Sequence, residues 1–317
     1  MQKIGFPIPA KEDEHRLALC PENIAKTQVA SYLIFEKGYG EVLGFSDDDY
    51  QKTGASVADR DVVCQCPIIC DPKPVISNEY FRTSTILFGW IHAVQGRHIT
   101  DALVDNKMTA IAWEEMFENG RHCFWRNNEI AGEASVMQAF LYLHKLPYEC
   151  SAAVIGRGNV ARGAIRMLEK VGCAVTVYDR KTSPLLRKEI KQYDVIINAV
   201  LWDVFRSDHL IYEEDLVKMK RNSMIIDISC DETMGIQSSH PTTIRKPIFS
   251  YKGILHYAVE NSPSLFYRSA SIAISNIVSS FLSELVYDRY NDTLHNAVIV
   301  KSGEIVDEKI LRFQKRI

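Results

Sequence analysis

Residues 153–161 read AVIGRGNVA, in which a short apolar run leads directly into the pattern G-x-G-x-x-A. This pattern predicts a strand, a tight turn at Gly156 and a helix that begins at the turn. Gly158 lets backbone N–H groups approach a pyrophosphate, and the small side chain of Ala161 lets the helix pack closely on the strand. Because a helix N-terminus favours negative charge, the stretch predicts a dinucleotide-binding turn.

The residues after this turn extend the same interpretation. A helical pattern covers 164–171, and Gly172 separates it from a second predicted strand at 174–178. Asp179 ends that strand at the spacing expected of an acid that binds a ribose hydroxyl. The predicted cofactor contacts are Gly156, Gly158, Asn159, Val160, Ala161, Asp179, Arg180, Lys181, Val200 and Leu201.

The 317 residues exceed the usual size of one hydrophobic core, which predicts two domains. Strand and helix patterns alternate, as is typical of parallel α/β sheets. We therefore expect two Rossmann-like parallel-sheet domains with a cleft between them, linked by long helices at 131–143 and 265–287. The predicted substrate domain is discontinuous, 1–130 plus 268–317, and the predicted dinucleotide domain covers 131–267.

Apolar runs bounded by turn residues predict the remaining elements. Those of the first domain are strands at 3–6, 32–36, 85–88 and 109–112 and a helix at 21–31, with a loop rich in glycine and aspartate after residue 36. Those of the second domain are strands at 195–200, 224–228 and 257–259.

Charge and cysteine content argue against several classes of partner. The net charge is −3 without a block of like charge, so we expect neither nucleic acid nor a membrane as partner. The N-terminus lacks the apolar core of a signal peptide, and no run of about 18 apolar residues occurs, which predicts a cytoplasmic protein with reduced thiols. Cys64, Cys66 and Cys70 read as a buried strand and turn without a fourth ligand at zinc-like spacing, so no metal is expected.

Three residues of the first domain are candidates for chemistry. His92 follows a predicted strand, and its imidazole can exchange a proton near neutral pH; a structural histidine is the alternative. Arg16 can hold a carboxylate through two parallel hydrogen bonds, whereas Lys73 offers a point charge that burial can tune for proton transfer. Solvated surface cations are the alternative for both. In the second domain Asp231 could meet a nicotinamide or a substrate amine, or it could cap a loop.

Several segments resemble the alanine dehydrogenase and transhydrogenase superfamily. EHRLALCP at 14–21 resembles E-x-R-V-A-L-T-P, and GYGEVLGFSDDDY at 38–50 resembles G-A-G-x-x-x-G-F-S-D-x-x-Y. DPKP at 71–74 is similar to a K-E-P loop with its lysine displaced by one position, and ILFGWIH at 86–92 resembles I-L-F-x-x-x-H. DISCD at 227–231 resembles D-I-A-I-D. These matches span nearly the whole chain.

This resemblance implies roles for the candidate residues. It implies that Arg16 and Lys73 bind the carboxylate of a keto acid, that His92 does the acid and base work, and that Asp231 lies beside the nicotinamide. It also implies the two-domain dehydrogenase fold and a nicotinamide cofactor.

Other segments are similar to one branch of the superfamily, the N5-(carboxyethyl)ornithine synthases, which form opines. They are GRGNVARGA at 156–164, YDRKT at 178–182 and NSPSLFYR at 261–268. This similarity implies reductive condensation of pyruvate with the side-chain amine of ornithine or lysine. The second amino acid needs binding groups of its own, although each candidate could instead be part of a surface ion pair. The candidates are Arg268, Glu114 and Glu115.

The cofactor signals in the sequence oppose each other. Asp179 suits a free ribose 2′-hydroxyl, whereas Arg157, Arg180 and Lys181 could bind a 2′-phosphate. The resemblance to the carboxyethylornithine enzymes implies NADPH, so we expect NADP(H) rather than NAD(H).

Two other functions remain open. An alanine dehydrogenase would use ammonia in place of the amino acid, and a cofactor-binding regulator would have no chemistry of its own. The presence of Arg16, Lys73, His92 and Asp231 together argues against the regulator. The apolar helices at 131–143 and 272–286 suit either a subunit interface or the core, and we expect a homo-oligomer.

Overall fold

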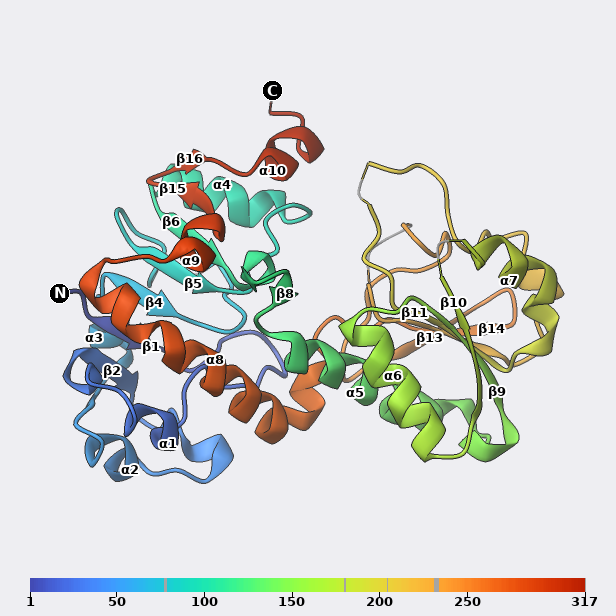
Figure 1. Ribbon diagram of the computed structural model, residues 1–317, viewed down its shortest axis with the longest axis horizontal. Coiled ribbons are helices and arrows are strands. Elements are labelled where there is room, and N and C mark those ends of the chain that lie inside the picture. The colour runs from blue at the N-terminus through green and yellow to red at the C-terminus, as the bar shows by residue number, and fades with distance from the viewer. Residues whose placement is uncertain (77–78, 180, 204, 231–233, 317) are drawn as a thin grey trace. The chain divides into compact units, whose positions relative to one another are not determined.

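A computed structural model describes residues 1–76, 79–179, 181–203, 205–230 and 234–316. The chain divides into two compact units, which we call unit 1 (Met1–Phe124 with Tyr267–Ile317) and unit 2 (Trp125–Phe266). Each unit has its own mostly parallel sheet with helices beside it (Figure 1). The predicted α/β fold class with two such domains is confirmed.

The sheet of unit 1 has the strand order β16-β15-β6-β5-β4-β1-β2-β3. Its strands are β1 (Ile4–Phe6), β2 (Leu33–Glu36), β3 (Ser56–Ala58), β4 (Ile68–Cys70), β5 (Ile86–Gly89), β6 (Thr109–Ala112), β15 (Val298–Lys301) and β16 (Glu304–Ile305). Neighbours from β6 to β3 pair in parallel, and β15 joins β6 in the antiparallel sense. The carboxyl ends of β1, β4, β5 and β6 therefore share one edge of the sheet, which is where open α/β sheets bind ligands.

Helix α8 (Tyr267–Tyr287) packs along the segment that carries Arg16. The buried hydroxyls of Ser271 and Ser275 each accept a backbone N–H, from Leu17 (2.8 Å) and Cys20 (2.8 Å). By length and composition the helical segment Ser262–Tyr287 could cross a membrane, with a mean hydropathy of 1.3, but half of that window is buried inside the protein. Its contacts are those of a core helix in a folded domain. The other helices of unit 1 are α1 (Pro21–Ile24), α2 (Asp47–Gln51), α3 (Arg60–Cys64), α4 (Arg97–Asp105), α9 (Asp292–Asn296) and α10 (Glu308–Phe313).

Three local predictions in unit 1 were wrong. The helix expected at 21–31 ends at Ile24, where the backbone leaves the helical pattern: the N–H groups of Lys26 and Thr27 bind the carbonyls three residues back, those of Asn23 (3.2 Å) and Ile24 (2.9 Å). The loop expected after residue 36 contains α2, which begins at a capping box between Ser46 and Asp49. The cysteine segment is not one strand and turn, since its first cysteine ends α3 and its last ends β4.

The sheet of unit 2 has the strand order β10-β9-β11-β12-β14-β13. Its strands are β9 (Ser151–Ile155), β10 (Ala174–Tyr178), β11 (Val195–Asn198), β12 (Met224–Asp227), β13 (Ile248–Tyr251) and β14 (Ile254–Tyr257). The pairs are parallel except that of β13 with β14. The strand expected at 257–259 was misplaced: it lies three residues earlier, where β13 and β14 form a hairpin.

Two glycines bring α5 (Trp125–Leu143) and α6 (Asn159–Lys170) into backbone contact. A Cβ atom on Gly163 would lie 1.9 Å from the Glu129 carbonyl oxygen, and one on Gly132 would lie 2.1 Å from the Val160 carbonyl oxygen. The crossing of these helices therefore depends on the absence of both side chains. Because α6 begins at the glycine-rich turn, the crossing also sets the position of its N-terminus.

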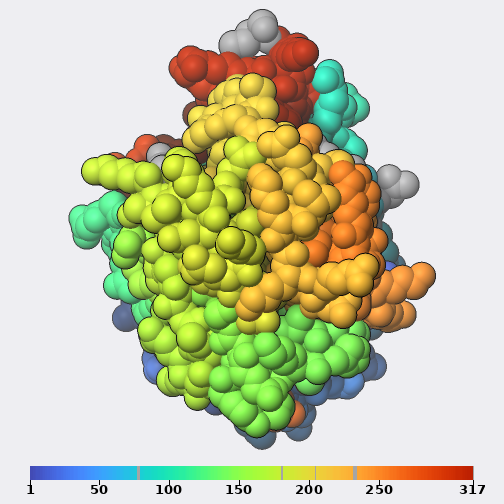
Figure 2. Space-filling view, turned by 90° about the vertical axis from the view of Figure 1, so that its right-hand side faces the viewer, coloured from blue at the N-terminus to red at the C-terminus, as the bar shows by residue number. Residues whose placement is uncertain are grey.

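Helix α7 (Ser183–Glu189) packs against the segment that follows β11. Arg187 Nε donates to the buried Asp215 carboxylate (2.6 Å), and the Arg187 guanidinium lies over the Tyr212 ring, 4.5 Å from its centre. The space-filling view shows the yellow-green surface around α7 next to the yellow surface of that later segment (Figure 2). The loops after β10 and β11 are therefore neighbours, as a nucleotide site at this edge requires.

Candidate functional site

Four loops of unit 1 bring charged side chains to the carboxyl edge of its sheet. Arg16 follows β1, Lys73 follows β4, His92 follows β5 and Glu114 follows β6. Each of these groups feels the charge of at least one other, so they form one electrostatic cluster. In this cluster the structure brings together four residues predicted from the sequence, Arg16, Lys73, His92 and Glu114.

Arg16 is held in a fixed position by two neighbours. Its Nε donates to Glu14 Oε1 (2.7 Å) and its Nη2 to Glu14 Oε2 (2.5 Å), and its guanidinium lies 4.9 Å from the centre of the Trp90 ring. Only 4% of Arg16 is exposed. Although burial raises the pKa of Glu14, the Arg16 charge and hydrogen bonds outweigh it and hold that pKa below its ordinary value. No role was predicted for Glu14, although it lies two residues before Arg16.

The loop that carries Lys73 is joined to the loop that carries His92. The Lys73 N–H donates to Asp71 Oδ1 (2.9 Å), and the Trp90 N–H donates to the Pro72 carbonyl (3.3 Å). Gly89 makes this approach possible, because a Cβ atom there would lie 1.9 Å from the Asp71 carbonyl oxygen. Burial together with repulsion from Lys11 and Arg16 lowers the pKa of the half-buried Lys73 to about 8.

His92 has a left-handed backbone, with φ at 51°. Such a conformation is costly for a residue with a side chain and persists where neighbours hold it. Glu114 stabilises this conformation, because its two carboxylate oxygens accept the N–H groups of His92 (2.6 Å) and Ile91 (3.2 Å). Glu114 was predicted as a possible substrate ligand, and in the structure its carboxylate binds the loop that carries His92.

The charges around His92 determine its protonation. Desolvation by surrounding protein and repulsion from Lys73, Lys11 and Arg16 hold the pKa of His92 well below its ordinary range. The His92 side chain is exposed in the structure, so it keeps part of its contact with solvent. Repulsion from the three cations therefore accounts for much of the lowering of its pKa. Its imidazole is therefore neutral near pH 7 and can accept a proton. Burial raises the pKa of Glu114 to about 7.

The other two candidates for the second amino acid lie at different places. Arg268 is exposed in the first turn of α8, and the preceding Tyr267 contacts the His15 ring at a centroid distance of 5.6 Å. Glu115 is paired with Lys309 through both carboxylate oxygens, each at 2.9 Å from Nζ. Arg268 is thus near the segment that carries Arg16, whereas Glu115 is occupied by an ion pair.

In unit 2 the glycine-rich turn has the geometry that a pyrophosphate needs. Gly156 has φ at 120°, and a Cβ atom there would lie 2.8 Å from the Ala199 carbonyl oxygen. A Cβ atom on Gly158 would meet nothing within 4 Å, so space is open beside the first turn of α6. Ala161 is fully buried against the sheet, and Asn159 and Val160 form the first turn of α6. These residues fit a bound dinucleotide phosphate.

Asp179 is fixed by its own turn. Its Oδ1 accepts the N–H groups of Lys181 (3.0 Å) and Thr182 (3.1 Å) and the Thr182 hydroxyl (3.0 Å), and Oδ2 accepts Arg157 Nε (3.3 Å). These hydrogen bonds, led by the Thr182 hydroxyl, hold the pKa of Asp179 below its ordinary value. One carboxylate oxygen therefore serves the turn, and the other faces a cation.

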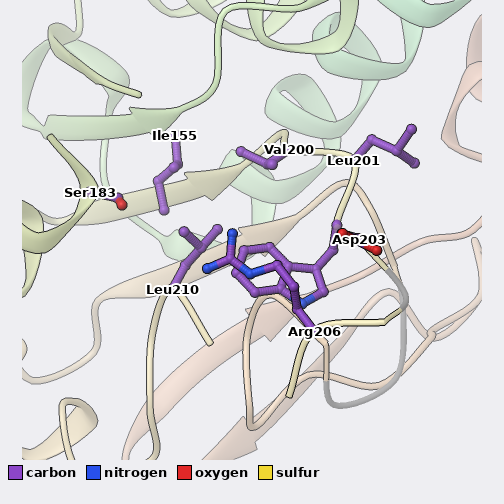
Figure 3. A pocket seen from close by; sticks show the side chains of 8 residues that line it. Ile155, Ser183, Val200, Leu201, Asp203, Arg206 and Leu210 are labelled. Carbon is purple, nitrogen blue, oxygen red and sulfur yellow. The ribbon is translucent and has the colours of Figure 1, made fainter. Parts of the chain in front are cut away.

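A small pocket of about 110 Å³ opens at the carboxyl edge of unit 2 (Figure 3). The Arg206 guanidinium covers the Trp202 ring at 4.4 Å from its centre and forms one side of the pocket. Val200 lines the pocket, and the Leu201 side chain is 85% exposed at its rim. The lining residues are Ile155, Ser183, Val200, Leu201, Trp202, Asp203, Arg206 and Leu210.

Two predicted residues, Asp231 and Arg180, lie outside the described residues. Asp227, four residues before Asp231 in the sequence and at the end of β12, accepts the Asn198 side-chain amide (2.9 Å), and burial raises the pKa of Asp227. Among the residues that the structure describes, no three His, Cys, Asp or Glu side chains gather to hold a metal ion. Cys64, Cys66 and Cys70 are buried free thiols.

Comparisons with known proteins agree with this architecture. The alanine dehydrogenase/PNT N-terminal domain family matches residues 6–124, and the C-terminal domain family matches residues 180–309. An L-alanine dehydrogenase structure is similar in fold, with a TM-score of 0.86 and 22% identity over 99% of both chains. A transhydrogenase structure from Sinorhizobium meliloti has a TM-score of 0.80 and 17% identity over 96% of this chain and 100% of its own.

Relatives in sequence cover nearly the full chain. An N(5)-(carboxyethyl)ornithine synthase from Clostridium botulinum is 32% identical over 92% of this chain and 97% of its own. One from Lactococcus lactis is 29% identical over 87% of this chain and 93% of its own. Alanine dehydrogenase 1 from Staphylococcus aureus is 26% identical over 94% of this chain and 93% of its own. These similarities confirm the predicted resemblance, and the chain belongs to the alanine dehydrogenase/PNT family of nicotinamide-dependent oxidoreductases.

Proposed function

We propose that the chain catalyses the reductive condensation of pyruvate with the side-chain amine of ornithine, or of lysine, to give an N-(1-carboxyethyl) amino acid. The observation that carries the proposal is the cluster of Arg16, Lys73 and His92 at the ends of adjacent parallel strands. The similarity to carboxyethylornithine synthases over 92% of the chain favours an amino acid over ammonia as the amine.

The cationic groups bind the keto acid. Arg16, which Glu14 and Trp90 hold in one orientation, and the Lys73 ammonium attract the pyruvate carboxylate. A fixed guanidinium costs little ordering on binding, so pyruvate is held in one orientation for attack at its keto carbon. In this scheme Arg268 binds the carboxylate of the second amino acid.

Proton transfer uses the shifted pKa values of two groups. The neutral imidazole of His92 accepts the proton that the amine loses as its nitrogen bonds to the keto carbon, and it passes this proton to the former keto oxygen, which becomes a hydroxyl. Lys73, with a pKa of about 8, then gives a second proton to this hydroxyl, which leaves as water to form the protonated imine. The bound nicotinamide supplies the hydride that reduces the imine carbon. We assign Asp231 to the nicotinamide side of this reaction.

We further propose NADP(H) as the cofactor, held by the turn at 156–161 with Val200 and Leu201 beside it. Asp179 accepts three donors on Oδ1 and Arg157 Nε on Oδ2, so in this proposal the cations Arg157 and Lys181, rather than Asp179, bind the 2′-phosphate. In Arg157→Ala we expect the KM for NADPH to rise about tenfold and the KM for NADH to change less than twofold. Steady-state kinetics with both cofactors measures this; an equal rise for both would contradict the assignment.

The pH dependence should report the charge of Lys73. Because its ammonium form binds the carboxylate and donates a proton, we expect kcat/KM for pyruvate to fall as the pH rises through about 8. Lys73→Arg keeps the charge at every pH, so its activity, although lower, should not show this fall. The amine substrate titrates in the same way with both enzymes, which makes the comparison internally controlled. A fall that persists unchanged in Lys73→Arg would assign it to another group.

The function itself is tested by measuring the oxidation of NADPH and, separately, of NADH with pyruvate and one of three amines: ornithine, lysine or ammonia. Turnover with ornithine or lysine, and the expected product by mass spectrometry, would support the proposal. Turnover with ammonia alone would instead identify an alanine dehydrogenase, as the similarity to the Staphylococcus aureus enzyme allows. Cofactor binding without turnover would reject pyruvate condensation with these amines.

A further inference from the structure

Gln314 joins the end of the chain to the loop that carries His92. It follows α10 directly and is only 5% exposed. Its side-chain amide donates to the carbonyl oxygens of Ala93 (2.7 Å) and Val94 (3.2 Å) and to the Thr100 hydroxyl (3.1 Å). Its amide oxygen accepts Arg316 Nε (2.7 Å). One buried side chain thus holds the two residues that follow His92.

The same loop closes on itself before α4. The Gly96 N–H donates to the His92 carbonyl (3.1 Å), and the Thr100 hydroxyl donates to the Ala93 carbonyl (3.0 Å). The turn is tight, since a Cβ atom on Gly96 would lie 2.8 Å from the His92 carbonyl oxygen. Figure 1 draws α10 beside α4 within unit 1, and Arg97 Nη1 donates to the Gln314 carbonyl (3.1 Å).

His92 is therefore fastened from two directions. On the side that precedes it, Glu114 binds the N–H groups of Ile91 and His92. On the side that follows it, Gln314 binds the Ala93 and Val94 carbonyls. A left-handed residue with a bulky side chain keeps that conformation only if its neighbours determine it, and these two side chains hold the peptides on either side of His92.

We propose that Gln314 is a positioning residue for His92, which it aims by holding the carbonyls of Ala93 and Val94. This inference rests on the proposed function of His92 in proton transfer. Gln314 touches backbone rather than the reacting groups, so its effect reaches the substrate only through the orientation of the imidazole. A misplacement of about 1 Å at a reacting group can cost about 100-fold in rate.

Two variants of Gln314 separate the effect of its hydrogen-bond donor from the effect of its size. Gln314→Glu keeps the length and the partner Arg316 but cannot donate to the two carbonyls. Gln314→Met removes both the donor and the acceptor. Arg312→Met is the matched control, because Arg312 is exposed in α10, two residues before Gln314, and pairs with Glu308 one turn away.

We expect kcat to fall about 10- to 100-fold in both Gln314 variants, with the KM for NADPH unchanged. Hydrogen exchange of the amides at 92–100 should become faster in both. The His92 imidazole, followed by NMR against pH, should titrate closer to its ordinary pKa of about 6.5, because the loosened loop moves away from the cations. The acidic limb of the rate profile should shift upward with it. Arg312→Met should change none of these.

Several results would overturn the proposal. Full activity in Gln314→Glu would show that the side chain only fills space. Faster exchange at 92–100 without a change in kcat or in the His92 titration would make its role structural alone. If the wild type turns over none of the amines, the proposed function is wrong. The NMR titration and the exchange rates still decide in that case whether Gln314 positions His92.

Discussion

Replacement of His92 by glutamine is expected to lower kcat for the condensation by about 10²- to 10⁴-fold, the usual contribution of a general acid or base. Glutamine can still hydrogen-bond but cannot carry a proton between amine and hydroxyl. The imidazole of the wild type is neutral near pH 7, because desolvation, together with repulsion from Lys73, Lys11 and Arg16, holds its pKa well below its ordinary range. The loss should therefore be present throughout neutral pH rather than only on one limb of the profile.

The measurement is steady-state NADPH oxidation with saturating pyruvate and amine, combined with cofactor binding by fluorescence. His98→Gln is the control, because His98 is an exposed histidine in α4, six residues further along the chain. Binding of NADPH should be the same in both variants. If His92→Gln keeps more than half of kcat, proton transfer must be assigned to Lys73 alone.

Gly163→Ala is expected to destabilise unit 2 by about 3 kcal/mol, at the upper end of the usual cost of overpacking. Helix propensity alone would favour alanine by about 1 kcal/mol, so the clash has to outweigh that gain. It does so because the new methyl group would lie 1.9 Å from the Glu129 carbonyl oxygen, a backbone atom that cannot rotate away. The helices α5 and α6 would be forced apart.

Gly158→Ala provides the contrasting variant in the same turn. Its φ is −75°, which alanine adopts without strain, and the new methyl group would meet no protein atom within 4 Å. We expect its unfolding temperature to be within 1–2 °C of the wild type, roughly a change below 0.5 kcal/mol, while the KM for the cofactor rises about tenfold or more because the methyl group occupies the phosphate approach.

Thermal unfolding and cofactor titration of the two variants test this contrast. We expect Gly163→Ala to unfold roughly 10 °C below the wild type. Equal loss of stability in both variants would mean that Gly158 also packs against protein. Unchanged stability of Gly163→Ala would show that α5 can move away at little cost, which the close backbone contact argues against.

The sequence alone was sufficient for the elements that depend on local pattern. The strand predicted at 174–178 and the strand predicted at 109–112 have those same bounds in the structure. Both are continuous apolar or β-branched runs between turn residues, a signal that is complete within a few residues. The helix predicted at 21–31 was wrong, because the backbone leaves the helical pattern after Ile24, where the Thr27 N–H binds the Ile24 carbonyl three residues back (2.9 Å).

The sequence therefore determined the α/β class, the glycine-rich turn and the residue types at the strand ends, since these follow from local pattern and from the chemistry of each side chain. The tertiary structure alone decided which distant side chains hold the loops that carry these residues. Glu114 reaches the His92 backbone across 22 positions of sequence, and Gln314 reaches Ala93 across 221. Such contacts depend on strand order and on where the chain end returns to the sheet, and neither leaves a periodic signal in the residues that make the contact.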